Sequence, residues 1–158
     1  MQFDYKKIQT PVGQLTLVAN AHALIAVLWE NDDPNRVKLV ELTQNLDHSI
    51  LNETEKQLIE YFAGQRSQFN LPLDFQGTAF QKSVWSALLN IPFGETRTYK
   101  DIAEAIGNVK AVRAVGAANG KNPISIIAPC HRVIGTNGKL IGFAGGLDKK
   151  KILLKLES

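Results

Sequence analysis

The chain contains one cysteine, Cys130, and this count limits both how the fold can be held together and which sites the chain can build. A single thiol has no second thiol to pair with, so a disulfide within the chain and a multi-cysteine metal site are both excluded. Packing must therefore stabilise the fold. At 158 residues, 44% of them apolar, the chain is long enough to bury a core as one or two small domains.

The first part of the chain predicts a small antiparallel sheet followed by helix. One segment alternates between apolar and polar residues, and the next is a continuous apolar run; both patterns are typical of strands. A helix is expected where apolar residues recur one turn apart before a glycine. The expected elements are strands at 12–18 and 23–29 around a hairpin turn at 20–22, a loop at 32–35 that can start a helix, and a helix at 53–64.

From residue 78 onward the pattern becomes helical. Thr78 and Gln81 form a capping box that predicts the start of one helix, and Thr98 predicts the start of a second helix that ends at Gly107. A third helix is expected at 110–119. Two short helices joined by a glycine-containing turn are typical of a helix-turn-helix, although a tightly packed helix pair produces the same pattern more often.

These elements predict an α/β (α+β) fold with two domains. The N-terminal α/β domain, residues 1–74, has a small antiparallel sheet with helices. The C-terminal domain, residues 75–158, is mostly helical and contains the helix-turn-helix. The segment 64–77, which includes Pro72, is expected to link the two.

Charge is distributed unevenly between these halves. Residues 1–74 carry a balance of −4, and residues 75–158 carry a balance of +7. Such a basic half indicates a polyanionic partner such as nucleic acid, unless its lysines only serve solubility. The chain has no apolar run that could cross a bilayer and no secretory signal, so we expect no membrane partner and a cytoplasmic, reducing location.

Cys130 lies at the end of an apolar approach, Ile126-Ile127-Ala128, and is followed by His131 and Arg132. Apolar burial alone raises the pKa of a thiol and makes it inert, so a reactive Cys130 needs a base or a positive charge nearby. Adjacency in sequence does not guarantee that the side chains meet. On the residues alone, a lone buried cysteine is most often a small apolar core residue.

Several motifs in register resemble the 6-O-methylguanine-DNA methyltransferases, also called alkylguanine-DNA alkyltransferases. The resemblance covers about residues 80–157; the N-terminal half resembles the family only in length and expected sheet content, which implies a ribonuclease-H-like domain. The matching motifs are Pro129-Cys130-His131-Arg132-Val133, Arg113-Ala114-Val115-Gly116, Asn122-Pro123, Gly145-Gly146-Leu147 and Glu157.

The resemblance implies a single-turnover repair reaction without a cofactor. Cys130 would take the alkyl group from guanine O6 and keep it as a thioether. His131 would accept the thiol proton through a water, and Glu157, on a last helix capped by Asp148, would orient His131. Asn122 would tie the turn around the site; otherwise it is a simple turn residue before a proline.

The resemblance also implies five contacts to DNA or to the base. A guanine must rotate out of the duplex to reach the thiol. Arg113 would fill the space that the guanine leaves in the stack. Without the resemblance, a contact from Arg113 to a phosphate is the better interpretation. Tyr99 would push the nucleotide out and donate to the base, unless it is only a half-buried helix residue. Lys150 would neutralise the leaving oxygen, unless it is a solvated lysine. The backbone at Val133 and Ala144 would read the guanine edge.

The chain departs from some family members in ways that bear on its ligands. A structural zinc in those members uses two cysteines, so we expect no metal here and interpret His22 and His48 as surface or turn residues. Phe143 stands where some members have tyrosine, and Ala144 where some have serine; both changes can alter the preference among alkyl groups.

Three other functions remain as alternatives to the repair enzyme. A lesion-binding protein without catalysis is the nearest, but such relatives lack the cysteine that this chain has. A helix-turn-helix regulator would need polar, base-reading side chains where this chain has alanines. A cysteine hydrolase would need more than the adjacent Cys130–His131 pair. We expect a monomer whose partner is double-stranded DNA containing alkylated guanine.

Overall fold

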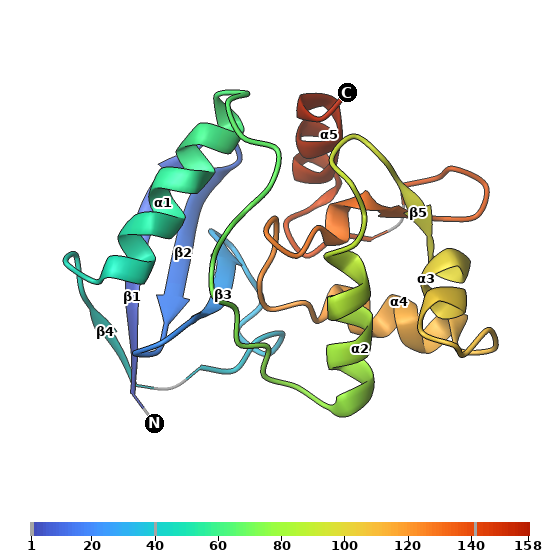
Figure 1. Ribbon diagram of the computed structural model, residues 1–158, viewed down its shortest axis with the longest axis horizontal. Helices are drawn as coiled ribbons and strands as arrows, with labels where there is room; N and C mark the ends of the chain where they lie inside the picture. Colours follow the sequence, from blue (N-terminus) through green and yellow to red (C-terminus); the bar gives the residue numbers. More distant parts are fainter. Residues whose placement is uncertain (1, 40, 141) are drawn as a thin grey trace.

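The computed structural model describes residues 2–39, 41–140 and 142–158. The N-terminal half contains a four-stranded sheet (Figure 1). The strand order is β3-β2-β1-β4; neighbouring strands are antiparallel except β4, which pairs parallel to β1. The strands are β1 (Phe3–Thr10), β2 (Gly13–Ala19), β3 (Leu24–Trp29) and β4 (Leu42–Gln44). The predicted hairpin is confirmed: Asn20 Oδ1 accepts from the backbone N–H groups of His22 and Ala23 in the turn.

Helix α1 (Ser49–Phe62) packs across one face of this sheet (Figure 1). It begins four residues before the predicted start at residue 53, because His48 caps it: the ring Nδ1 accepts from the Ile50 N–H at 3.1 Å. A histidine cap is not among the usual sequence signals. His22 is an exposed residue of the hairpin turn, as predicted, whereas His48 is a partly buried helix cap, which was not predicted.

Residues 32–35 form a loop as predicted, but no helix starts from it. The side chain of Asp32 makes other contacts. One of its oxygens accepts from the Trp29 N–H at 3.2 Å, and the carboxylate also binds Arg36 at 2.6 and 2.7 Å. With its carboxylate engaged in this way, Asp32 closes a loop rather than capping a helix.

The linking segment 64–77 runs between the sheet and the helices (Figure 1). It is held to β3 by backbone bonds from Leu24 N–H to Pro72 O at 2.8 Å and from Asp74 N–H to Leu24 O at 3.0 Å. The helical half follows. Its elements are α2 (Ala79–Leu88), β5 (Arg97–Thr98), α3 (Tyr99–Ala105), α4 (Val112–Gly120), a 3-10 turn (Cys130–Arg132), β6 (Val133–Ile134) and α5 (Leu147–Leu156).

Side-chain caps explain where α2 and α3 begin. The capping box predicted at Thr78 and Gln81 is present, and Thr98 caps α3 as predicted, in a second capping box that it forms with Asp101. Helices α3 and α4 form the predicted helix pair. The predicted Asp148 cap is wrong, since Gly146 occupies the N-cap position of α5 and Asp148 lies in the first turn. A carboxylate there still interacts favourably with the helix N-terminus.

Two apolar cores meet next to Cys130. The first joins the sheet and α1 to residues 124–127 and to Leu153 of α5. The second joins α2, α3 and α4 around Trp85, whose indole N–H donates to Ala118 O at 2.8 Å, and it includes Cys130. The approach to the cysteine therefore belongs to one core and the cysteine to the other. Within the described ranges, no helix is both long and apolar enough to span a bilayer.

Candidate active site

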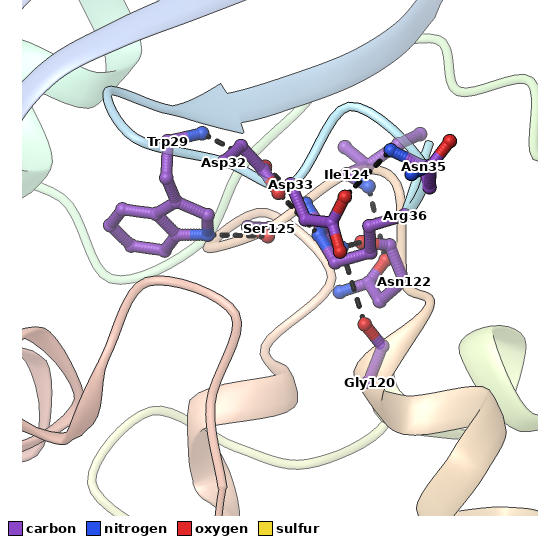
Figure 2. Close-up of polar contacts among 9 residues, drawn as sticks. All are labelled: Trp29, Asp32, Asp33, Asn35, Arg36, Gly120, Asn122, Ile124 and Ser125. Carbon is purple, nitrogen blue, oxygen red and sulfur yellow. Dashed lines mark hydrogen bonds and ion pairs between the residues drawn. The ribbon is translucent and has the colours of Figure 1, made fainter. Parts of the chain in front are cut away.

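The segment that leads to Cys130 is an extension of the N-terminal sheet. Val27 N–H of β3 donates to Pro123 O at 2.9 Å. The Trp29 indole N–H donates to Ser125 Oγ at 3.1 Å (Figure 2). At the next residue, Ile126, the backbone has a φ of +73°, a conformation that costs a β-branched residue energy and persists only where its surroundings enforce it. This turn redirects the chain into the second core.

Asn122 closes the turn from inside. Its side chain is fully buried; Nδ2 donates to Ala128 O at 2.8 Å, and Oδ1 accepts from Ile124 N–H at 3.1 Å. The amide is also close enough to the Cys130 thiol to lower its pKa. Asn122 is therefore a turn residue that also contributes to the surroundings of the thiol.

Arg36 binds the backbone of the same turn from its outer side. It was not among the predicted site residues. Its side chain is only 9% exposed and is paired with Asp32. Nη1 donates to Asn122 O at 2.7 Å and to Gly120 O at 3.4 Å (Figure 2). The spacing of Asp32 and Arg36 is the one signal in the sequence, and it indicates an ion pair without revealing what the guanidinium reaches.

The Cys130 thiol is buried, and burial raises its pKa above the ordinary value. Four neighbours oppose this effect. The polar side chains of Asn122 and Ser125 and the positive charges of Arg36 and Lys150 all favour the thiolate and lower the pKa. The resting thiol is therefore protonated, in surroundings that stabilise the thiolate once a base removes the proton.

Glu157, at the C-cap of α5, accepts a hydrogen bond from His131, the candidate base. Its Oε2 accepts from His131 Nε2 at 2.8 Å, and Arg132 donates Nε to Oε1 at 2.7 Å and Nη2 to Oε2 at 2.9 Å. Burial opposes ionisation, but the hydrogen bonds from His131 and Arg132 outweigh it and hold the pKa of Glu157 well below its usual range. The group is a carboxylate, so it can only accept hydrogen bonds.

The ionised Glu157 determines the tautomer of His131. Because the carboxylate needs a donor, the proton of the neutral ring lies on Nε2, and Nδ1 carries the lone pair. Nδ1 is buried and has no hydrogen-bond partner among the described residues. Burial lowers the pKa of His131, against the opposing effect of Glu157, so the ring is neutral at pH 7 and able to accept a proton.

A cavity of about 510 Å³ opens onto the thiol, within the usual size range for small-ligand sites. Two of the predicted base-binding residues, Tyr99 and Ala144, line it with Cys130. Burial raises the pKa of Tyr99, so its hydroxyl keeps its proton and can donate. The other lining residues are Arg36, Val112, Gly116, Asn119, Gly120, Gly142 and Phe143.

Lys150 is not a solvated lysine, which excludes that alternative. Its side chain is fully buried, and Nζ donates to Val133 O at 2.6 Å and lies 5.9 Å from the centre of the Phe143 ring. Burial lowers its pKa, and the nearby Cys130 acts in the opposite direction. Lys150 and Val133 therefore lie together near Cys130.

Arg113 is the one predicted residue that the structure places away from this cluster. It lies exposed on α4, next to the residues of that helix that line the cavity, Val112 and Gly116. Ala114 and Ala117 are also exposed there, so the outer surface of α4 carries small side chains around a single arginine. Such a surface can approach a nucleic-acid groove closely.

Known proteins resemble this chain over both of its halves. The family model described as 6-O-methylguanine DNA methyltransferase, DNA binding domain, matches residues 79–158, and the model of the ribonuclease-like domain of the same family matches residues 4–75. A methylated-DNA–protein-cysteine methyltransferase of Methanosarcina acetivorans is 48% identical over 155 residues, covering 97% of each chain. One of Mycobacterium tuberculosis is 46% identical, covering 97% of this chain and 91% of the relative.

Solved structures give the same result. A crystal structure of Mycobacterium tuberculosis OGT in complex with DNA matches with a TM-score of 0.90 and 45% identity, covering 98% of this chain and 92% of the other. The O6-methylguanine-DNA methyltransferase from Pyrococcus kodakaraensis, at 21% identity and a TM-score of 0.57, shares the fold. From these matches over nearly its whole length, the chain belongs to the 6-O-methylguanine DNA methyltransferase family.

Proposed function

We propose that this protein repairs DNA by transferring one alkyl group from the O6 atom of guanine to the Sγ atom of Cys130. The observation that carries the proposal is the buried thiol at the wall of a cavity of about 510 Å³, with a neutral imidazole on the next residue. The match to methylated-DNA–protein-cysteine methyltransferases over nearly the full length supports it. Double-stranded DNA containing alkylated guanine is then the partner.

The reaction is an in-line displacement at the alkyl carbon. The bond from Sγ to carbon forms as the bond from carbon to O6 breaks, and the electron pair of that bond leaves on O6. The thiol proton passes to Nδ1 of His131 through a water, and Glu157 stabilises the imidazolium that results. Solvent later protonates the guanine anion. The carbon–sulfur bond of the thioether is stable to water and to thiols, and no step of the reaction breaks it, so each chain reacts once.

The other residues recognise the extruded base. Tyr99 donates its hydroxyl hydrogen to the base within the cavity, and the backbone at Val133 and Ala144 reads the guanine edge. Lys150 stabilises negative charge that grows on the departing oxygen. Arg113, exposed on α4, enters the stack where the guanine was.

We propose that the two predicted domains, 1–74 and 75–158, act as one monomer in the cytoplasm. The two parts share the first core, and contacts from both surround the cysteine. A cytoplasmic location would keep the thiol reduced.

Methyl transfer from duplex DNA tests the proposal directly. DNA carrying O6-methylguanine with a labelled methyl group is mixed with the protein, and the label is located by mass spectrometry. We expect one methyl group per chain, on Cys130, with no further turnover. Cys130→Ala keeps the small buried volume and should accept none. Turnover beyond one equivalent, or label on another residue, contradicts the mechanism.

The alternative, a protein that binds the lesion without repairing it, makes a different prediction for the same mixture. It would bind modified DNA and leave both the label and the thiol unchanged. The nucleophile in the cavity wall argues against this alternative, because binding alone needs no buried thiol among groups that favour its thiolate.

A further inference from the structure

Tyr61 brings a buried hydroxyl from the N-terminal half into the candidate active site. It lies on α1, 96 residues from Glu157 in sequence, and its side chain is 1% exposed. Its hydroxyl is 2.5 Å from Glu157 Oε2. The mechanism above does not use this group, and its contact with the carboxylate is as short as any in the site.

The oxygen that Tyr61 contacts is the one that holds His131. Oε2 accepts from three donors: the Tyr61 hydroxyl, His131 Nε2 at 2.8 Å and Arg132 Nη2 at 2.9 Å. Burial, together with the adjacent carboxylate, raises the pKa of Tyr61, so the phenol keeps its proton and donates it to Glu157. Donors that share one oxygen divide its negative charge, and each bond is weaker than it would be alone.

Neither partner of this bond is free to move away. The Tyr61 ring is packed by Phe62, Phe69 and Phe93, with ring centres 5.2, 5.3 and 6.2 Å away. The carboxylate is held separately, because Arg132 donates two bonds to it and a third to Ile91 O at 2.6 Å. Loss of the Tyr61 hydroxyl would therefore leave the carboxylate in the same position. It would increase the negative charge on Oε2 that is available to the other donors.

We propose that Tyr61 is a positioning residue for the alkyl transfer: its hydroxyl shares the Glu157 oxygen with His131 and so limits how strongly the carboxylate holds the imidazole. The inference rests on the proposed function, in which His131 accepts the Cys130 proton. An imidazole held too strongly becomes charged at higher pH and can no longer accept that proton. The other charged groups that face His131 are Arg132, beside it in the 3-10 turn, and Lys150 from α5, and both oppose its protonation.

The test compares Tyr61→Phe with Tyr5→Phe, a matched loss of a hydroxyl on β1, where Tyr5 packs against a different cluster. The titration of His131 is followed by NMR without DNA, and the single-turnover rate of methyl transfer is measured against pH. For Tyr61→Phe we expect the His131 midpoint and the acidic limb of the rate profile to move to higher pH by about 0.5 to 1 unit, which makes transfer about 3- to 10-fold slower on that limb. Tyr5→Phe should move neither.

A second substitution guards against a variant that fails to fold. Incorporation of 3-fluorotyrosine at position 61 keeps the ring and makes the hydroxyl a stronger donor, so both midpoints should move to lower pH. A lowered unfolding midpoint with unchanged titration and rate profile would overturn the inference and leave Tyr61 a structural residue. The proposed function fails separately, if the unmodified protein accepts no methyl group; the NMR titration does not depend on that result.

Discussion

Replacing Glu157 by glutamine should destabilise the protein far more than the loss of one surface ion pair. The carboxylate is 4% exposed and accepts from Tyr61, His131 and Arg132. A glutamine amide offers one oxygen and one NH2 group, and either orientation points that NH2 at a donor. The buried guanidinium of Arg132 then loses its counter-charge. Breaking a buried pair in this way costs about 3 to 5 kcal/mol in the free energy of unfolding.

Urea unfolding at pH 7 measures this cost, and Glu60→Gln is the matched control. Glu60 also binds an arginine, Arg66, at 3.0 Å, but the two side chains are 31% and 27% exposed. An exposed pair of this kind contributes about 0 to 1 kcal/mol. If Glu157→Gln lost no more stability than Glu60→Gln, the inference that the Glu157 cluster supports the fold would be refuted.

The pH dependence of the stability difference between the unmodified protein and Glu157→Gln gives a second check. The folded state holds the pKa of Glu157 below its usual range, so folding favours the carboxylate. This contribution is fully present above the ordinary glutamate pKa of about 4.3 and declines as the pH falls below it. The difference in unfolding free energy between the unmodified protein and Glu157→Gln should therefore narrow as the pH falls from about 4.3 toward about 3. The comparison is made in this range because the substitution also changes the titration of His131, whose pKa the carboxylate raises. A difference that widened over this range would contradict the sign of the Glu157 shift.

Three further outcomes follow from the structure. Arg113→Ala should slow methyl transfer from duplex DNA and spare transfer from the free base O6-methylguanine; equal effects on both substrates would remove Arg113 from the stack. Folding lowers the pKa of His131, so its contribution to the free energy of unfolding is present above its ordinary value of about 6.5 and should be lost as the pH falls below it, as urea titrations from pH 7.5 to 5 would measure. Gly145→Ala would place a methyl 2.7 Å from the Trp29 ring and should lower stability by about 1 to 3 kcal/mol, whereas Gly120→Ala, with no heavy atom within 4 Å of the added carbon, should not.

Local signals in the sequence predicted much of the fold. Both capping boxes, at Thr78 and Thr98, involve residues three apart, and the β2–β3 hairpin follows from alternation around a turn. The elements that were missed depend on distant partners. Strand β4 is exposed along its whole length and is ordered by parallel pairing with β1, which no local pattern indicates.

The site shows the same division between local and distant signals. The family motifs indicated Cys130 and its neighbours, but no spacing connects Arg36 or Tyr61 to residues roughly 90 positions away. Lys150 is an intermediate case. Three consecutive lysines suggest a solvated run, yet Lys150, Leu153 and Glu157 follow at steps of three and four, the helical spacing that places residues on one buried face.

Burial of the thiol answers a problem that a single-use protein has. A permanently ionised cysteine would react with oxidants and stray alkylating agents, and each such reaction would end the function of the chain. Here burial raises the pKa of Cys130, and the neighbouring side chains of Asn122, Ser125 and Lys150 favour the thiolate once it forms. The neutral His131 can take the proton only as an imidazolium held by Glu157. In the proposed mechanism the thiol therefore stays protonated until His131 takes its proton, and this low resting reactivity protects the chain from reactions other than alkyl transfer.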